Sequence, residues 1–221
     1  MFLYEMHCHT AEGSRCASLS GSELAHLYAE KGYQGVIVTD HFYGGNTAID
    51  RKKPWSKWVD GFLKGYENAQ KEGKRMGLQV FLGWEYNDRG TEILTYGLDG
   101  EWLKNHPELT NINAEKYCDI IRNAGGITIH AHPFRQRHYV KTIRLMPGLT
   151  DGVEAVNKCN EPKENYLADQ YADNFGLMKI GGTDFHNLGH ASVLGGIAMP
   201  FAVTDVREIF EAARAEKLRI L

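Results

Sequence analysis

The stretch Ile127-Thr128-Ile129-His130-Ala131-His132-Pro133 has the apolar pattern of a buried strand and ends in two histidines. Four other predicted strands also end in histidine or a carboxylate: MHCH at residues 6–9, VIVTDH at 36–41, VFLGWE at 80–85 and KIGGTDFH at 179–186. If these strands are parallel and close into a barrel, their carboxyl ends meet at one mouth, so distant residues converge on a single cavity. The sequence therefore predicts a barrel with a metal site at its mouth.

Helical patterns alternate with strand patterns along the whole chain. Ser20 with Glu23 forms a capping box, Asn113 is a helix cap, and Thr204 caps the last predicted helix. Seven βα-like units without a break in composition favour a single domain over residues 1–221, built as a parallel α/β barrel. The predicted strands cover residues 2–8, 35–39, 78–84, 92–97, 127–131, 153–157, 177–181 and 193–199.

Composition narrows the class of protein. With 221 residues and 43% hydrophobic residues, the chain can bury a substantial core. Its net charge of -3 comes without a basic stripe, which disfavours binding to duplex nucleic acid. No apolar run approaches the ~18 residues of a membrane span, and the first residues lack a secretory pattern. The four cysteines form no CxxC pair, so we expect a reduced, cytoplasmic protein without a membrane segment.

The strand-end residues have the chemistry of metal ligands. His7 and His9 are two positions apart in a strand, so both imidazoles point the same way and can bind one ion; Asp184 and His186 can do so from a turn. A carboxylate ending an apolar strand is costly to bury unpaired, and a cation removes that cost. The nitrogen and oxygen donors suit two or three ions of zinc, manganese or iron.

Each of these residues also has an ordinary structural explanation. Glu85 and Asp184 would then form salt bridges to a neighbouring lysine or arginine, and Asp40 with His41 would form a turn or a helix cap. The recurrence of the pattern at five strand ends favours the metal site over these separate explanations.

Together the motifs resemble those of the polymerase and histidinol phosphatase (PHP) superfamily. The resemblance implies a distorted, TIM-like (βα)7 barrel with a two- or three-metal site. The matching segments occur in the family's order and span nearly the whole chain: His7-Cys8-His9-Thr10, Thr39-Asp40-His41, Gly83-Trp84-Glu85, Ala131-His132-Pro133-Phe134-Arg135 and Gly182-Thr183-Asp184-Phe185-His186.

The resemblance also implies how the ligands are shared among the ions. Glu85 bridges a first ion to a second one, which His132 binds, and His41 with His186 hold a third. The first ion has the ligands His7, His9, Glu85 and Asp184.

Two ligand positions of the family carry other residues in this chain. Ser14 and Arg15 stand where the third ion normally gains a histidine or aspartate, and Leu94 stands where the second normally gains a histidine. Glu92 lies two residues before Leu94, on the same strand face, and is a possible replacement. Glu12 is the corresponding candidate at the third site, and Asp40 is a further candidate donor.

Cations near the predicted mouth are candidates for binding phosphate. Arg135 matches the arginine of the family's HPxR pattern, and Arg15 and Lys158 also follow strand ends. The alternative for each is a surface charge or an ion pair. His130 is two positions from His132 and is expected on the same strand face, so it is a candidate general acid, or else a buried histidine with a structural partner. Asn157 would bind a ligand or cap the following turn.

The favoured function is a metal-dependent phosphoesterase that cleaves a small phosphorylated metabolite or nucleotide. The ions would lower the pKa of a bridging water and so supply hydroxide, while also neutralising charge on the phosphoryl oxygens. One alternative is a metal-dependent amidohydrolase, which predicts few cations facing a phosphate and no inhibition by inorganic phosphate. Another is a non-catalytic PHP-like domain that binds at most one ion.

Overall fold

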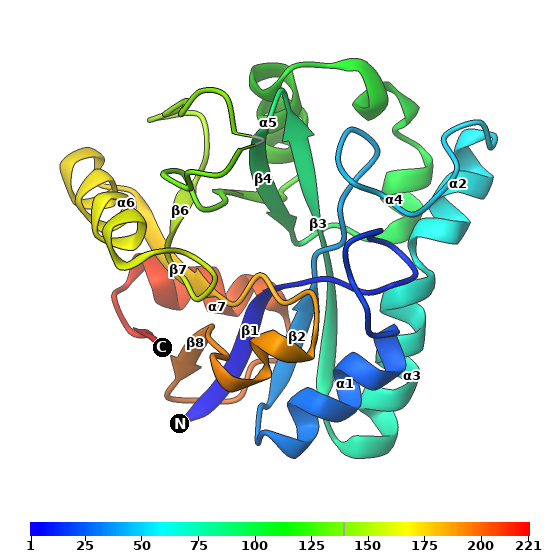
Figure 1. Ribbon diagram of the computed structural model, residues 1–221, viewed down its shortest axis with the longest axis horizontal. Helices are drawn as coiled ribbons and strands as arrows, with labels where there is room; N and C mark the ends of the chain where they lie inside the picture. The colour runs from blue at the N-terminus through cyan, green and yellow to red at the C-terminus, as the bar shows by residue number, and fades with distance from the viewer. Residues whose placement is uncertain (139) are drawn as a thin grey trace.

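The protein, described by a computed structural model over residues 1–138 and 140–221, is built on a nine-stranded sheet. Its strands follow the spatial order β7-β6-β5-β4-β3-β2-β1-β8-β9. The sheet curls around an apolar interior (Figure 1). The strands are β1 (Phe2–Cys8), β2 (Gly35–Val38), β3 (Gln79–Asp88), β4 (Thr91–Tyr96), β5 (Ile127–His130), β6 (Gly152–Asn157), β7 (Met178–Gly182), β8 (Ile197–Met199) and β9 (Arg219–Ile220).

The segment after β7 returns to β1 and nearly closes the barrel. Cys8 and Phe185 form a parallel bridge, and the backbone N–H of Asp184 donates to the carbonyl of His7 at 2.8 Å. The N–H of His9 donates to the carbonyl of Phe185 at 3.0 Å. These bonds bring the ends of β1 and β7 together, although the two lie at opposite ends of the sequence. The predicted distorted TIM-like barrel is thus confirmed.

The barrel departs from seven repeated βα units in three ways. Strands β3 and β4 form a tight hairpin, so β4 runs antiparallel to both β3 and β5. Strand β8 is antiparallel to β1, and the described residues between β5 and β6 form no helix. The expectation of a wholly parallel sheet is therefore wrong at β4 and β8. At β4 the reason is a two-residue turn at Arg89 and Gly90, both with positive φ, which reverses the chain.

Helices cover the outside of the sheet where the apolar spacing predicts them. The capping box of Ser20 and Glu23 begins α1, and the Asn113 side chain caps α5. The last helix is capped by Asp205, with Glu208 completing a capping box, and not by Thr204 as predicted. The helices are α1 (Gly21–Glu30), α2 (Trp55–Phe62), α3 (Lys64–Met76), α4 (Gly100–Lys104), α5 (Ala114–Asn123), α6 (Pro162–Phe175) and α7 (Val206–Arg214), with short 3-10 turns η1 (Pro107–Asn111) and η2 (Leu188–Ser192).

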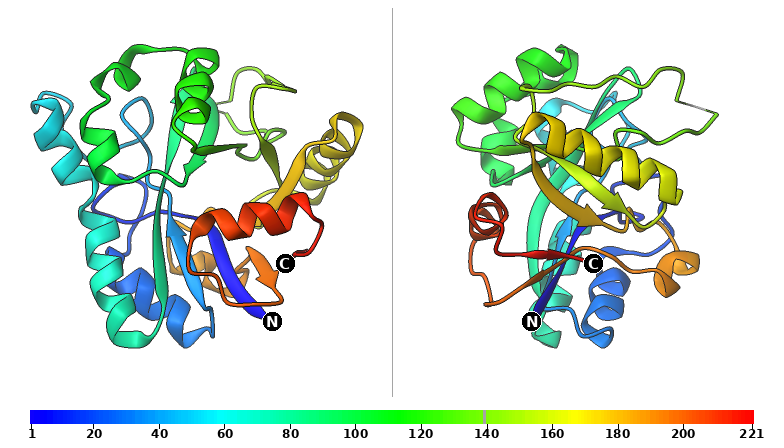
Figure 2. Two further views of the ribbon diagram at one scale, coloured as in Figure 1. Left: turned by 180° about the vertical axis from the view of Figure 1, so that it is seen from behind. Right: turned by 90° about the vertical axis from the view of Figure 1, so that its left-hand side faces the viewer.

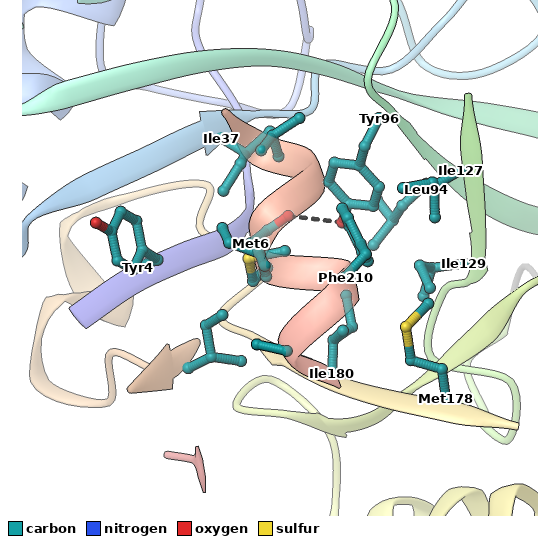
Figure 3. Packing of buried hydrophobic residues seen from close by; sticks show 14 of the residues in the cluster. Tyr4, Met6, Ile37, Leu94, Tyr96, Ile127, Ile129, Met178, Ile180 and Phe210 are labelled. Carbon is teal, nitrogen blue, oxygen red and sulfur yellow. Dashed lines mark hydrogen bonds between the residues drawn. The ribbon is translucent and has the colours of Figure 1, made fainter. Parts of the chain in front are cut away.

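Helix α7 lies across the back of the barrel (Figure 2). Its Phe210 points into the interior, where it meets apolar side chains of the surrounding strands (Figure 3). Tyr96 is within this cluster, and its hydroxyl donates to the carbonyl of Met6 at 2.9 Å. The amino-terminal side of the barrel is thus a packed core, and space for a ligand remains at the carboxyl ends of the strands. Among the described residues, no helix has the length and apolar character to cross a bilayer.

Candidate metal centre

The side chains predicted as metal ligands meet at the carboxyl ends of the strands. Four groups of three have ligand atoms within 4.8 Å of one another, and they share members, so they form one continuous cluster. The cluster borders a cavity of about 500 Å³. The four groups are His7, Glu85 and His132; His7, His9 and Asp184; His9, His41 and His186; and His41, Glu85 and Glu92.

Glu85, at 1% exposure, is the central carboxylate of the cluster. Its Oε2 lies 2.6 Å from His41 Nδ1 and 3.7 Å from His9 Nε2. Its Oε1 lies 3.2 Å from His7 Nε2 and 3.3 Å from His132 Nε2. A single carboxylate facing four imidazoles through both oxygens has the geometry of a ligand that bridges two ions.

Asp184 enters the cluster from the segment after β7. Its Oδ1 lies 3.1 Å from His9 Nε2 and 3.4 Å from His7 Nε2, and its Oδ2 accepts a 2.5 Å bond from Arg135. Asp184 and His132 both have positive φ, at 59° and 29°, outside the comfortable range of L residues. Such backbone strain is typical of functional sites, where the surrounding structure holds the residue in place.

Hydrogen bonds at Nδ1 orient three of the imidazoles. His7 Nδ1 donates to Glu154 at 2.9 Å, and His186 Nδ1 donates to the carbonyl of Asp184 at 2.8 Å. Ser14 donates its hydroxyl hydrogen to Asp40, so His9 Nδ1 is the donor in its 3.1 Å bond to Ser14. Each ring then carries its lone pair on Nε2, the tautomer that binds a metal.

Several buried polar atoms in the cluster lack hydrogen bonds within the described part of the chain. These are His7 Nε2, His41 Nδ1 and Glu85 Oε2. His41 Nδ1 and Glu85 Oε2 are only 2.6 Å apart, yet neither makes a hydrogen bond of acceptable geometry. Unpaired polar atoms at this depth are costly unless another group satisfies them, and a cation would do so for all three. The donors present therefore fit divalent ions.

The electrostatics of the cluster agree with this fit. Burial raises the pKa of Glu85, but the charges of His7 and His41 outweigh it and hold that pKa well below its usual range. Burial lowers the pKa of His7, but carboxylates, Glu154 first among them, raise it well above the usual value. Glu85 thus stays ionised and attracts protons to nearby imidazoles, and a divalent cation can take the place of those protons.

The structure supports one of the three proposed additional donors. Glu92 lies on β4 with its Oε2 3.4 Å from His132 Nε2 and its Oε1 4.0 Å from His41 Nδ1. Leu94, two positions later on β4, packs in the barrel core. Glu92 thus enters the cluster from the strand on which the family's histidine is expected.

The other two additional donors, Glu12 and Asp40, are not brought to the cluster, which corrects the expectation. Glu12 accepts bonds from Gly21 N and Asn68 Nδ2 at the start of α1. Asp40 accepts bonds from the backbone and hydroxyl of Thr10 and from Ser14. Both carboxylates are occupied in holding the loop that follows β1.

Of the three predicted phosphate-binding cations, only Arg135 lines the cavity. Its guanidinium donates to Asp184, to Asn157 Oδ1 at 2.9 Å and to Asn160 Oδ1 at 2.9 Å. Arg15 is exposed, and its Nε donates to the carbonyl of Thr47. Lys158 is not among the residues that line this cavity.

His130, the predicted general acid, belongs to none of the four groups and does not line the cavity. Strand β5 ends at His130 and the backbone turns at His132, so the rule that residues i and i+2 share a face does not hold here. The ring packs edge-on to Tyr171, with centroids 6.4 Å apart. Burial, together with the charge of His132, lowers the pKa of His130 to about 3.

Sequence reasoning missed three residues that shape the site. Glu154 on β6 orients His7, and Glu5 on β1 joins β1 to the segment after β7 through bonds to His7 N and Thr183 N. Both are carboxylates inside apolar strands. Because a buried carboxylate is costly without a partner, their positions in the sequence could have indicated a structural role. The third is Cys16, whose thiol has its pKa lowered to about 6 because hydrogen bonds to His186 and His41 outweigh burial. No pattern in the sequence points to it.

Replacing Glu154 with Gln tests its role in orienting His7. Its Oε1 accepts from His7, and its Oε2 accepts from His132 N at 2.9 Å. Loss of its charge weakens the hold on the His7 ring, so we expect metal affinity to fall about 10- to 100-fold while the fold is retained. Competition with a chelator measures this. Glu164→Gln is the matched control, because buried Glu164 bonds Gln136 N and Arg137 and not the cluster. Equal metal affinity in Glu154→Gln and the unaltered protein would contradict the role.

Comparison with known proteins supports the fold at low sequence identity. No family model and no curated protein matches the sequence. A two-domain protein of Bacteroides vulgatus containing a predicted PHP-like metal-dependent phosphoesterase aligns with 100% of this chain at a TM-score of 0.74 and 13% identity. This chain spans 64% of the length of that protein.

Two further solved structures are similar over nearly their whole length. One is a candidate metal-dependent phosphoesterase of Bifidobacterium adolescentis, with a TM-score of 0.56, 15% identity and coverage of 96% of both chains. The other is an amidohydrolase of Chromobacterium violaceum, solved with sulfate and without metal, with a TM-score of 0.63 and 17% identity over 99% of this chain and 97% of that one. The chain therefore shares its barrel fold with these structures, as the resemblance of the five motifs predicted.

Proposed function

We propose that this protein is a metal-dependent phosphoesterase that acts on a small phosphorylated metabolite or nucleotide. The observation that carries the proposal is the convergence of five imidazoles, Glu85 and Asp184 at one barrel mouth, beside a buried arginine. A cavity of about 500 Å³ is of a size that holds a small ligand. The two phosphoesterase-like structures support the reaction class through their shared fold.

The residues divide into those that would hold ions and those that would hold substrate. His7, His9 and Asp184 would bind a first ion, Glu85 would bridge it to a second at His132 and Glu92, and His41 with His186 would bind a third. When bound, such ions, whether zinc, manganese or iron, activate water and neutralise charge that develops on the phosphoryl oxygens. Glu154, Ser14 and Asp40 keep the imidazoles aimed into the cavity.

Arg135 is the side chain that would orient the phosphate. It lines the cavity next to Asp184, and its bonds to Asn157 and Asn160 hold the guanidinium plane in one orientation. A fixed planar guanidinium suits bidentate contact with two phosphate oxygens. The guanidinium therefore lies beside the residues that would hold the ions, where it would bind the phosphoryl group while the alcohol leaves.

A second candidate function is amide hydrolysis at the same metal centre. Among the described residues that line the cavity, Arg135 is the only lysine or arginine, and it is already paired with Asp184. This scarcity of cations favours amide hydrolysis. The likeness to an amidohydrolase of similar length supports it as well. A carbonyl substrate needs less positive charge around it than a phosphate does.

Hydrolysis assays with added Mn²⁺, Zn²⁺ or Fe²⁺ distinguish the two functions. We expect phosphate release from mononucleotides and other monoesters, inhibition by inorganic phosphate, and no turnover in a His7→Ala/Asp184→Ala variant. Turnover of N-acyl substrates alone, unaffected by phosphate, would establish the second candidate instead. At most one ion per chain in elemental analysis, with no hydrolysis of either class, would contradict both.

Replacing Arg135 with Lys tests the phosphate contact. We expect kcat/KM for a phosphate monoester to fall about 10- to 100-fold and inhibition by phosphate to weaken, because lysine cannot make the bidentate contact. Metal content, measured in parallel, shows whether Asp184 still functions as a ligand after the change. With metal content retained, an unchanged KM and an unchanged phosphate inhibition constant would rule out a phosphate contact by Arg135.

A further inference from the structure

The loop after β1 places a thiol beside the three-imidazole part of the cluster. His9, His41 and His186 have ring centroids 4.4, 4.3 and 5.7 Å apart, taken pairwise, and ligand atoms within 4.8 Å of one another. Cys16 lines the same cavity as His41 and His186, and the influence of these two imidazoles outweighs burial and lowers the pKa of its thiol. The thiol is thus next to the two imidazoles that the family resemblance assigns to the third ion.

The side chains of Glu12, Ser14 and Arg15 in this loop already make hydrogen bonds to other parts of the protein. Ser14, at a position where the family has a ligand, donates to Asp40 Oδ1 at 2.7 Å and accepts from His41 N at 3.0 Å. Arg15 turns to the carbonyl of Thr47, and Glu12 bonds the start of α1. Within residues 11–16, Cys16 is therefore the side chain with a metal-binding atom at the cavity.

We propose that the Cys16 thiolate is the third protein ligand of the ion that His41 and His186 would hold. This inference rests on the metal centre proposed above but not on the identity of the substrate. Two imidazoles and one thiolate, with a water molecule in the fourth position, are donors that tetrahedral Zn²⁺, and Co²⁺ as its substitute, readily accept. The neighbouring groups contain the carboxylates Glu85, Glu92 and Asp184, which are harder donors. The third site therefore differs from the other two in the metal that it prefers.

Cobalt binding to the chelator-treated protein, under anaerobic conditions, tests the proposal without measuring catalysis. A thiolate ligand produces an intense sulfur-to-cobalt charge-transfer band in the near ultraviolet, which imidazole and carboxylate ligands do not produce. We expect the band in the unaltered protein and its loss in Cys16→Ser, with binding of the third ion weakened at least about tenfold.

Two further variants serve as controls. Cys159→Ser should retain the band, because the Cys159 thiol lies 3.5 Å from His190 Nδ1 and 3.8 Å from the carbonyl of Asp184, outside the three-imidazole group. Cys16→Asp supplies an oxygen ligand, so it should restore the ion count without the band, which separates loss of a ligand from loss of the fold.

The remaining outcomes of the cobalt experiment would refute either the Cys16 ligand alone or the whole metal centre. Cobalt that binds to the unaltered protein without a charge-transfer band refutes thiolate ligation but leaves the metal centre intact. A band that survives in Cys16→Ser, or that disappears in Cys159→Ser, assigns the sulfur ligand to another cysteine and refutes the proposal. A protein that binds no cobalt at all refutes the metal centre and the proposed hydrolase together.

Discussion

Replacing Glu85 with Gln is expected to lower kcat/KM by more than about 100-fold and to reduce the metal content of the purified protein. Changes to residues that merely support a ligand cost about 10- to 100-fold, so loss of a bridging ligand should cost more. The Glu85 carboxylate faces His7, His9, His41 and His132 at 2.6–3.7 Å, so loss of its charge affects more than one ion. Elemental analysis and steady-state kinetics at saturating metal measure the two effects.

Glu92→Gln is the matched comparison for this prediction. Glu92 lies at the rim of the cluster. Among the described imidazoles, only those of His41 and His132 come within 4.0 Å of it, whereas Glu85 faces four, so loss of the Glu92 charge should be milder. A chelator competition series ranks the affinities of the two variants. Activity of Glu85→Gln within tenfold of the unaltered protein, at full metal content, would show that Glu85 does not bridge the ions.

Replacing Glu5 with Ala is expected to lower the free energy of unfolding by about 3–5 kcal/mol. Glu5 Oε1 accepts from Met6 N at 3.0 Å, His7 N at 2.9 Å and Thr183 N at 2.8 Å. Its Oε2 accepts from the hydroxyls of Tyr28, at 2.7 Å, and Thr183. Alanine would leave these fully or largely buried donors without an acceptor, which is costly at each one.

Chemical denaturation of the metal-free protein measures this loss, which corresponds to a fall in Tm of roughly 10 °C. Glu5→Gln is the control, because its amide oxygen still accepts the three backbone bonds and its amide group can donate to the hydroxyls of Tyr28 and Thr183. We expect that variant to lose about 1 kcal/mol. Equal losses in the two variants would mean that the charge of Glu5, and not its hydrogen bonds, is what stabilises the barrel closure.

The candidate metal site was largely predictable because its ligands lie at strand ends. A barrel brings such ends to one mouth whatever their separation in sequence, so the seven candidate ligands could be named without coordinates. Glu92 was predictable for a related reason, since residues two apart on a strand share a face. Both inferences rest on the geometry of strands, and the ends and alternation of a strand can be recognised from its sequence.

The failures occurred where the chain leaves regular structure. His130 was assigned to the face of His132, but the strand ends between them and His132 has a φ of 29°, so the alternation is interrupted. Glu12 was chosen because it is near the first motif in sequence, whereas the loop turns it towards Asn68 and turns Cys16 towards His186. The course of a loop depends on contacts with other elements, which its own residues do not reveal.

The sequence by itself determined that strands and helices alternate and that the donors of a metal site lie at the ends of strands, because hydrophobic periodicity and residue chemistry are local properties. Only the tertiary structure decided which atoms meet. It reversed β4, aimed Glu154 and Ser14 at the Nδ1 atoms of His7 and His9, and put Cys16 beside the third group of imidazoles. These outcomes depend on chain reversal and on contacts between distant segments, and a pattern in one segment carries no information about its partner's position.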